Sequence, residues 1–222
     1  MAERIKLHPE TPHVKRIFTI ADKVRQGAVL LFPTDSQYAL GCDYTNKEGI
    51  ERIRAIRALG KDDHLTLLCD SLSGIDTFAY ISDRNFKLIK RLIPGPYTLI
   101  LPARKEVPKL LVHPKKKTVG IRVPDYPICD ELIKEIGHPM VSITAKKPQM
   151  DGDALAEFER EPFLREFEKL VDIIIDNQQE LSSRETTIID MTGEEAVILR
   201  RGLGIDRAEE VFRMQGEPIT EA

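Results

Sequence analysis

Cysteine is scarce in this sequence of 222 residues: Cys42, Cys69 and Cys129 are the only three, and no two of them form a C-x-x-C pair. An odd number of widely spaced cysteines argues against a disulfide framework and against a zinc ribbon. The five histidines show no helical i, i+4 spacing with one another or with cysteine. We therefore expect no metal site.

Long apolar runs are absent as well. No stretch approaches the ~20 residues that a membrane helix needs, and the first residues lack the apolar segment of a signal peptide. We therefore expect a cytoplasmic protein without a membrane partner.

Neither sign of charge predominates, because 33 basic and 36 acidic side chains give a formal net charge of −3. Binding to a nucleic acid would need a local basic patch rather than attraction by the whole molecule. The length favours one large domain, and the chain contains no internal repeat and no low-complexity linker. We expect one domain over residues 9–214 and a flexible C-terminal tail over residues 215–222.

Short apolar runs alternate with amphipathic segments along the chain, which is typical of an α/β fold. Strands are expected at residues 28–32, 65–69, 97–101, 118–123, 140–144, 173–176, 187–191 and 196–200. Helices are expected from Thr11 to Gly27, from a capping box of Thr45 and Glu48, at residues 85–92, 128–136 and 154–170, and from Asp206. Residues 192–195 predict a hairpin between the last two strands, and hence a mixed sheet.

The common nucleotide-binding motifs are missing. The sequence contains no G-x-x-x-x-G-K-[ST] loop, no G-x-G-x-x-G after a strand, and no G-x-S-x-G nucleophile elbow. A nucleotide site in this chain would need a less common arrangement.

Polar side chains follow the first buried strand, where residues 33–41 contain two hydroxyls, a carboxylate and a phenol. Open α/β sheets place ligands at the carboxyl ends of their strands, so this segment is a candidate site. On composition alone, a polar loop that caps its own backbone is an equally good interpretation.

Arg122 lies inside an otherwise apolar strand, where an unpaired guanidinium would be costly to bury. Either a buried acidic partner or an anionic ligand must receive it, and its planar fork suits phosphate or carboxylate. Three lysines precede this strand, Lys115, Lys116 and Lys117, and form either a solvated loop or a basic patch.

Two further strand ends carry groups that can contact an anion. Ser142, Thr144 and Lys146 alternate, so they share one face if the strand continues that far. This row could contact phosphate or could be the solvent face of an edge strand. Arg200 and Arg201 stand beside a glycine at the end of the hairpin, where they could hold phosphate or face water.

Taken in order, five segments of the chain resemble the YrdC/YciO family. Five ordered matches between residues 33 and 202 are more specific than any one of them. The segments are residues 33–41 (P-T-D-S-Q-Y-A-L-G), 94–98 (P-G-P-Y-T), 118–124 (T-V-G-I-R-V-P), 142–146 (S-I-T-A-K) and 186–202 (T-T-I-I-D … I-L-R-R-G).

The resemblance implies a single domain with a twisted mixed sheet, flanking helices and a concave basic face. Synthases of this family condense L-threonine, bicarbonate and ATP into threonylcarbamoyl-AMP and pyrophosphate, for the modification of adenosine 37 in tRNA. Mg²⁺ would accompany ATP, held mainly by phosphate oxygens. The family is also described as binding double-stranded RNA, so RNA is an expected partner.

The resemblance also implies roles for particular residues, and none of them is a covalent nucleophile. Thr34 and Tyr38 would frame a threonine pocket, and Arg122 would hold a carboxylate or a phosphate. Lys115, Lys116 and Lys117 would bind RNA. The residues implied to contact the nucleotide are Arg57, Lys61, Ser142, Thr144, Lys146, Thr186 and Arg200.

Two departures make the chain more similar to the YciO branch than to the synthases. Where synthases carry K-x-R, this chain has Arg57 and Leu59, and where they carry S-x-[ST]-A-N, it has Lys146 in place of asparagine. Losing one charged phosphate contact costs about 1.5–3 kcal/mol, or one to two decades in binding. The sequence leaves three functions open: an active synthase, a non-catalytic nucleotide- or RNA-binding module, and another reaction on the same sheet.

Overall fold

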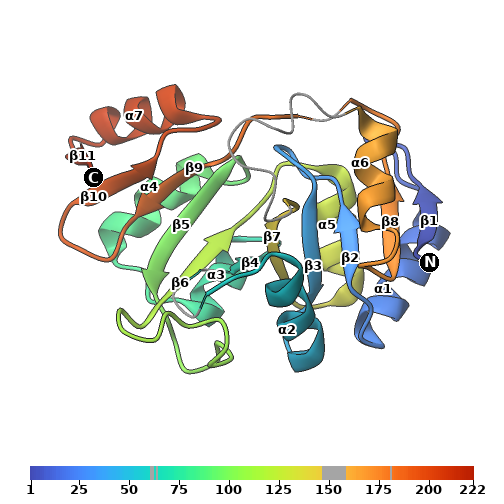
Figure 1. Ribbon diagram of the computed structural model, residues 1–222. Coiled ribbons are helices and arrows are strands. Elements are labelled where there is room, and N and C mark those ends of the chain that lie inside the picture. Colours follow the sequence, from blue (N-terminus) through green and yellow to red (C-terminus); the bar gives the residue numbers. More distant parts are fainter. Residues whose placement is uncertain (61–62, 64, 147–158, 181) are drawn as a thin grey trace.

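A long mixed sheet runs through the molecule, with the N-terminus at one edge and the C-terminus at the other (Figure 1). The computed structural model describes residues 1–60, 63, 65–146, 159–180 and 182–222. In this part of the chain the strand order is β1-β8-β2-β3-β7-β4-β6-β5-β9-β10-β11. The strands are β1 (Glu3–Lys6), β2 (Leu30–Phe32), β3 (Ala39–Asp43), β4 (Thr66–Leu68), β5 (Tyr97–Pro102), β6 (Thr118–Arg122), β7 (Met140–Thr144), β8 (Ile173–Asp176), β9 (Thr187–Asp190), β10 (Ala196–Arg200) and β11 (Ile219–Glu221).

Helices cover the two faces of this sheet unequally. Those of the described residues are α1 (Val14–Arg25), α2 (Lys47–Ile56), α3 (Leu72–Phe78), α4 (Asp83–Leu92), α5 (Pro127–Ile136), α6 (Arg160–Phe167) and α7 (Ile205–Met214). The buried residues of α2, α3, α4, α6 and α7 pack in one large apolar cluster. Those of α1 and α5 pack in a second cluster against β2, β8 and neighbouring strand ends. Because side chains alternate along a strand, the two clusters occupy opposite faces.

The face under α1 and α5 continues beyond these helices with a different chemical character. Leu68 and Met140 belong to the second apolar cluster, and strand alternation places Thr66 and Ser142 on the same face. The strand register carries this row across the sheet, because Thr66 pairs with Gly120, Gly120 with Ile100, and Ile100 with Asp190. Apolar residues thus give way to small and polar ones where the candidate site lies.

Most of the predicted elements are present, and the mixed sheet is confirmed. The last two predicted strands pair antiparallel as β9 and β10, with a register shift between Ile198 and Arg200. Helix α2 starts one residue later than predicted, because the Asn46 side chain accepts a hydrogen bond from the Gly49 N–H at 3.0 Å. Thr45 instead donates its hydroxyl to Asp43 at 2.7 Å.

Three strands and one helix were not predicted: β1, β3, β11 and α3. The prediction of a flexible tail is wrong for residues 219–221, which form β11 and pair in parallel with β10. Helix α6 covers only Arg160–Phe167 of the predicted 154–170, and residues 154–158 lie outside the described residues. No described helix has the length and apolar character needed to cross a membrane.

Candidate functional site

A cavity of about 310 Å³ opens on the polar part of the sheet face. Its wall combines cations, hydroxyl groups and a few apolar side chains from strands distant in sequence. The lining residues are Arg57, Thr66, Thr98, Ile100, Lys116, Thr118, Arg122, Ser142, Ile143, Thr144, Lys146, Glu185, Thr186, Ile188, Asp190, Leu199 and Arg200. A cavity with this lining suits an anion that also carries an apolar portion.

The cavity unites most of the residues predicted to contact a nucleotide. Eight of the predicted site residues line it, namely Arg57, Lys116, Arg122, Ser142, Thr144, Lys146, Thr186 and Arg200. The predicted residues Thr34, Tyr38, Lys115 and Lys117 do not. Lys61 lies outside the described residues.

Arg122 is buried and has an acidic partner. Its side chain is 9% exposed and is paired with the carboxylate of Asp35, which is 10% exposed. The same guanidinium donates to the Ser36 hydroxyl at 3.1 Å. The Arg122 Nε–H, however, has no hydrogen-bond partner within the described residues. Of the two alternatives left open by the sequence, the structure thus contains the buried acidic partner.

Arg57 offers a second unused donor. Its Nη1 donates to the Lys146 carbonyl at 2.9 Å, while its buried Nε–H lacks a partner among the residues that the structure describes. Burial lowers the pKa of Arg57 despite the opposing charges of Asp63 and Glu185. The guanidinium stays charged in a partly dry environment, where an anion would stabilise it.

Glu185 is a cavity residue that the sequence did not single out. Its Oε1 accepts from Lys146 Nζ at 2.7 Å and its Oε2 from Arg200 Nη1 at 2.8 Å. Burial alone would raise the pKa of Glu185, but the hydrogen bond from Lys146 and the charges of Arg200, Lys146 and Arg57 together hold it below its ordinary value. The only available signal was the position of a carboxylate directly before Thr186 in a predicted phosphate-binding segment.

Arg200 is fixed to the backbone beside it as well as to Glu185. Its Nε donates to the Thr186 carbonyl and its Nη2 to the Thr186 hydroxyl, both at 2.9 Å. Burial lowers the pKa of Arg200, against the opposing charge of Glu185. Arg200 thus has a defined position in the wall before any ligand binds.

Gly202 makes this arrangement possible. A Cβ on this residue would overlap the backbone of Glu185 and Thr186, which cannot move away as a flexible side chain could. We expect Gly202→Ala to displace residues 185–186, to cost about 1–3 kcal/mol through overpacking, and to lower the thermal midpoint by about 5 °C. Thermal unfolding followed by circular dichroism measures this. Gly193→Ala is the control, because its Cβ would make only ordinary contact at 3.5 Å; equal midpoints for both variants would contradict the prediction.

Thr34 and Tyr38 lie beside the cavity residues without lining the cavity. The Thr34 hydroxyl donates to the Gln37 carbonyl at 2.7 Å, and the Tyr38 hydroxyl donates to Asn177 Oδ1 at 2.9 Å. Burial raises the pKa of Tyr38. Their assignment to a threonine pocket stays a prediction, although Asp35 and Ser36 between them contact Arg122.

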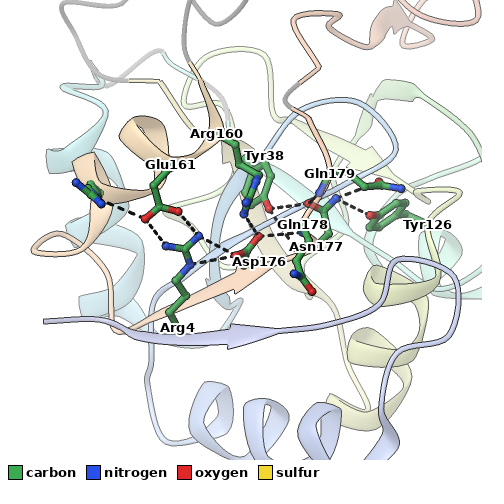
Figure 2. A network of polar contacts seen from close by, with 10 residues as sticks. Arg4, Tyr38, Tyr126, Arg160, Glu161, Asp176, Asn177, Gln178 and Gln179 are labelled. Atoms are coloured by element: carbon green, nitrogen blue, oxygen red, sulfur yellow. Dashed lines mark hydrogen bonds and ion pairs between the residues drawn. The ribbon is translucent and has the colours of Figure 1, made fainter.

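Tyr38 borders a polar network that the sequence did not predict (Figure 2). At its centre Asp176 is fully buried and accepts hydrogen bonds from Arg4 at 2.8 and 3.1 Å, from Arg160, and from the Gln178 N–H at 2.9 Å. The neighbouring Asn177 donates to the Tyr126 hydroxyl at 2.8 Å. The network ties β1, α6 and the segment after β8 to the loop that contacts Arg122.

The predicted RNA-binding lysines lie in an exposed turn, one residue of which lines the cavity. The backbone N–H groups of Lys115 and Lys116 donate to His113 Nδ1 at 3.2 and 3.1 Å, which orders the turn. Lys116 reaches the cavity wall, and Thr118 begins β6 directly after the turn. The described part of the chain holds no group of three acidic, histidine or cysteine side chains that could bind a metal.

Comparison with protein families agrees with this geometry. The Sua5/YciO/YrdC family model, described as telomere recombination, matches residues 22–202. The uncharacterized protein YciO of Escherichia coli is 39% identical over 204 residues, which cover 92% of this chain and 97% of YciO. The threonylcarbamoyl-AMP synthase of Vibrio vulnificus is 30% identical over 135 residues, covering 60% of this chain and 72% of the synthase.

Solved structures show the same fold. The crystal structure of Escherichia coli YciO has a TM-score of 0.81 and 36% identity, covering 91% of this chain and 97% of that one. The crystal structure of Pyrococcus abyssi Sua5 complexed with L-threonine has a TM-score of 0.81 and 25% identity, covering 99% of this chain and 62% of that one. The family resemblance and the α/β fold expected from the sequence are thereby confirmed.

Proposed function

Because the chain belongs to the Sua5/YciO/YrdC family, we propose that it binds a nucleotide through its phosphates in the cavity and catalyses threonylcarbamoyl-AMP formation. The observation that carries the proposal is the cavity wall, which brings together three arginines, two lysines and several hydroxyl side chains from segments distant in sequence. Phosphate oxygens would accept hydrogen bonds from these groups and neutralise their charge.

The reaction needs positioning and charge neutralisation rather than a covalent nucleophile. L-threonine and bicarbonate condense to a carbamate with loss of water. A carbamate oxygen then attacks the α-phosphorus of ATP, and pyrophosphate leaves with the electrons of the broken P–O bond. Arg57, Arg122 and Arg200 would stabilise the charge on the phosphates. The hydroxyls of Ser142 and Thr144, which line the cavity, would donate to phosphate oxygens. Mg²⁺ would be held mainly by the phosphates and would neutralise part of their charge.

The expected threonine site adjoins the phosphate site. The Pyrococcus abyssi relative was crystallised with L-threonine. In this chain Thr34 and Tyr38 flank Asp35 and Ser36, which contact Arg122. A threonine held at this loop would therefore lie next to the Arg122 guanidinium of the cavity wall, as near-attack positioning requires.

Pyrophosphate release from ATP tests this function. We expect release to depend on both L-threonine and bicarbonate, and Arg57→Ala to lower kcat/KM about tenfold to a hundredfold, because one charged phosphate contact is lost. Arg213→Ala removes an exposed arginine of α7 and should leave the rate unchanged. A wild-type rate no higher than background would eliminate the synthase function.

A second candidate is nucleotide or RNA binding without catalysis. Two observations favour it: Lys146 pairs with Glu185 where synthases carry asparagine, and Lys116 of the exposed lysine turn lines the cavity. If this candidate holds, RNA affinity should fall steeply with salt, because phosphate contacts release counterions. An absence of RNA binding at low salt would remove the RNA-binding form of this candidate.

A further inference from the structure

Glu185 connects two of the cations that would receive a phosphate. Its two carboxylate oxygens are occupied separately, one by Lys146 at 2.7 Å and the other by Arg200 at 2.8 Å. The Glu185 side chain is only 29% exposed, so solvent screens this cluster incompletely. An anion that binds Lys146 or Arg200 must share them with a carboxylate already in place.

The inner wall of the cavity has a small net charge. Four cations, Arg57, Arg122, Lys146 and Arg200, stand against two carboxylates: Glu185 in the wall, and Asp35, which pairs with Arg122. Lys116 and Asp190 also line the cavity and cancel one another. Two positive charges remain, whereas without Glu185 there would be three.

This balance matches one kind of ligand. A phosphate monoester carries about −1.5 to −2 charges near neutral pH, and a free nucleoside triphosphate carries roughly twice that. We infer that Glu185 is a specificity-determining residue that restricts the cavity to nucleotides with about two net negative charges. A nucleoside monophosphate and a Mg²⁺-complexed triphosphate meet this condition, whereas a free triphosphate does not. The inference rests on the proposed binding of a nucleotide in this cavity and adds the charge class of that nucleotide.

Glu185 acts by repulsion that grows with the charge of the ligand. A phosphate bound to Lys146 or Arg200 would lie within roughly 6 Å of the Glu185 carboxylate, given ordinary hydrogen-bond lengths. At that separation, repulsion changes affinity by about tenfold or more for each additional ligand charge that is near. Glu185→Gln keeps the size and the acceptor oxygen but removes the charge. A purely structural role would affect all nucleotides equally, whereas a charge filter changes their ratio.

Titration calorimetry with AMP and ATP tests the inference in the presence of EDTA. We expect wild type to bind AMP about tenfold or more tightly than ATP. Glu185→Gln should move the ratio about tenfold toward ATP, and Lys146→Gln, which removes a cation, should move it toward AMP. Adding Mg²⁺ should bring the affinity of wild type for ATP close to that for AMP. Glu51→Gln is the matched control, because Glu51 is an exposed carboxylate of α2 and its loss changes the whole-molecule charge equally.

The outcomes of this experiment distinguish the inference about Glu185 from the proposed nucleotide binding on which it rests. If both nucleotides bind but the ratio is the same in wild type and both cavity variants, or if wild type prefers free ATP, the inference fails and nucleotide binding stands. If wild type binds neither nucleotide, both fail. Opposite shifts in the two cavity variants, with the control unchanged, support the inference even if one variant is less stable.

Discussion

Arg122→Met is expected to lower nucleotide affinity more than a hundredfold and to reduce the free energy of unfolding by about 3 kcal/mol, because breaking a buried ion pair leaves an uncompensated charge. Both members of the pair are nearly inaccessible, at 9% exposed for Arg122 and 10% for Asp35. The variant also removes the free Nε–H donor and the hydrogen bond to Ser36. Urea unfolding and calorimetric titration with AMP measure the two effects.

The double variant Arg122→Met/Asp35→Asn separates stability from binding. Removing both charges eliminates the unpaired carboxylate, so we expect about 2 kcal/mol of the lost stability to return. Affinity for AMP should not return, because the guanidinium proposed to bind the phosphate is still absent. Recovery of binding together with stability would contradict a direct contact between Arg122 and the ligand.

Several residues of the cavity wall could be predicted from the sequence, because the ends of the apolar runs that form strands are visible there. Arg122, Ser142 and Thr144 each follow or interrupt an apolar run, and the carboxyl ends of such runs are where α/β sheets bind ligands. Glu185 was missed because its partners depend on strand order. Lys146 is 39 residues away in sequence, and only the folded sheet shows that the two side chains meet.

The missed strands have a similar explanation. β1 (Glu3–Lys6) has three charged residues and a single apolar one, Ile5, which is too little apolar surface to predict a strand, yet its backbone pairs with β8 along its whole length. β11 (Ile219–Glu221) is three residues long and is stabilised by pairing with β10. β3 (Ala39–Asp43) continues directly from a predicted ligand loop and is buried at every residue. Tertiary pairing determines all three, and local propensity is weak evidence for it.

Asp176→Asn is expected to destabilise the protein by about 3 kcal/mol, because an amide cannot satisfy two guanidinium groups as a carboxylate does. Asp176 is fully buried and accepts from both Arg4 and Arg160, so the variant loosens the attachment of β1 and α6 to β8 (Figure 2). For a chain of this size the thermal midpoint should fall by about 6–12 °C. Asp22→Asn is the control, because Asp22 is exposed and pairs with Arg25 one helical turn away, a contact worth under about 1 kcal/mol.

The pH dependence of the difference between wild type and Asp176→Asn identifies the charge as the cause. Burial alone would raise the pKa of Asp176, but the Gln178 N–H and the guanidinium groups of Arg4 and Arg160 together hold it below its ordinary value. A carboxyl whose pKa is lower in the folded state stabilises the fold above its unfolded pKa of about 3.9 and loses this effect as the pH falls through the folded value. The difference in unfolding free energy should therefore be full at neutral pH and should shrink in strong acid. A difference that is the same at neutral pH and in acid would attribute the destabilisation to altered packing and not to the lost carboxylate.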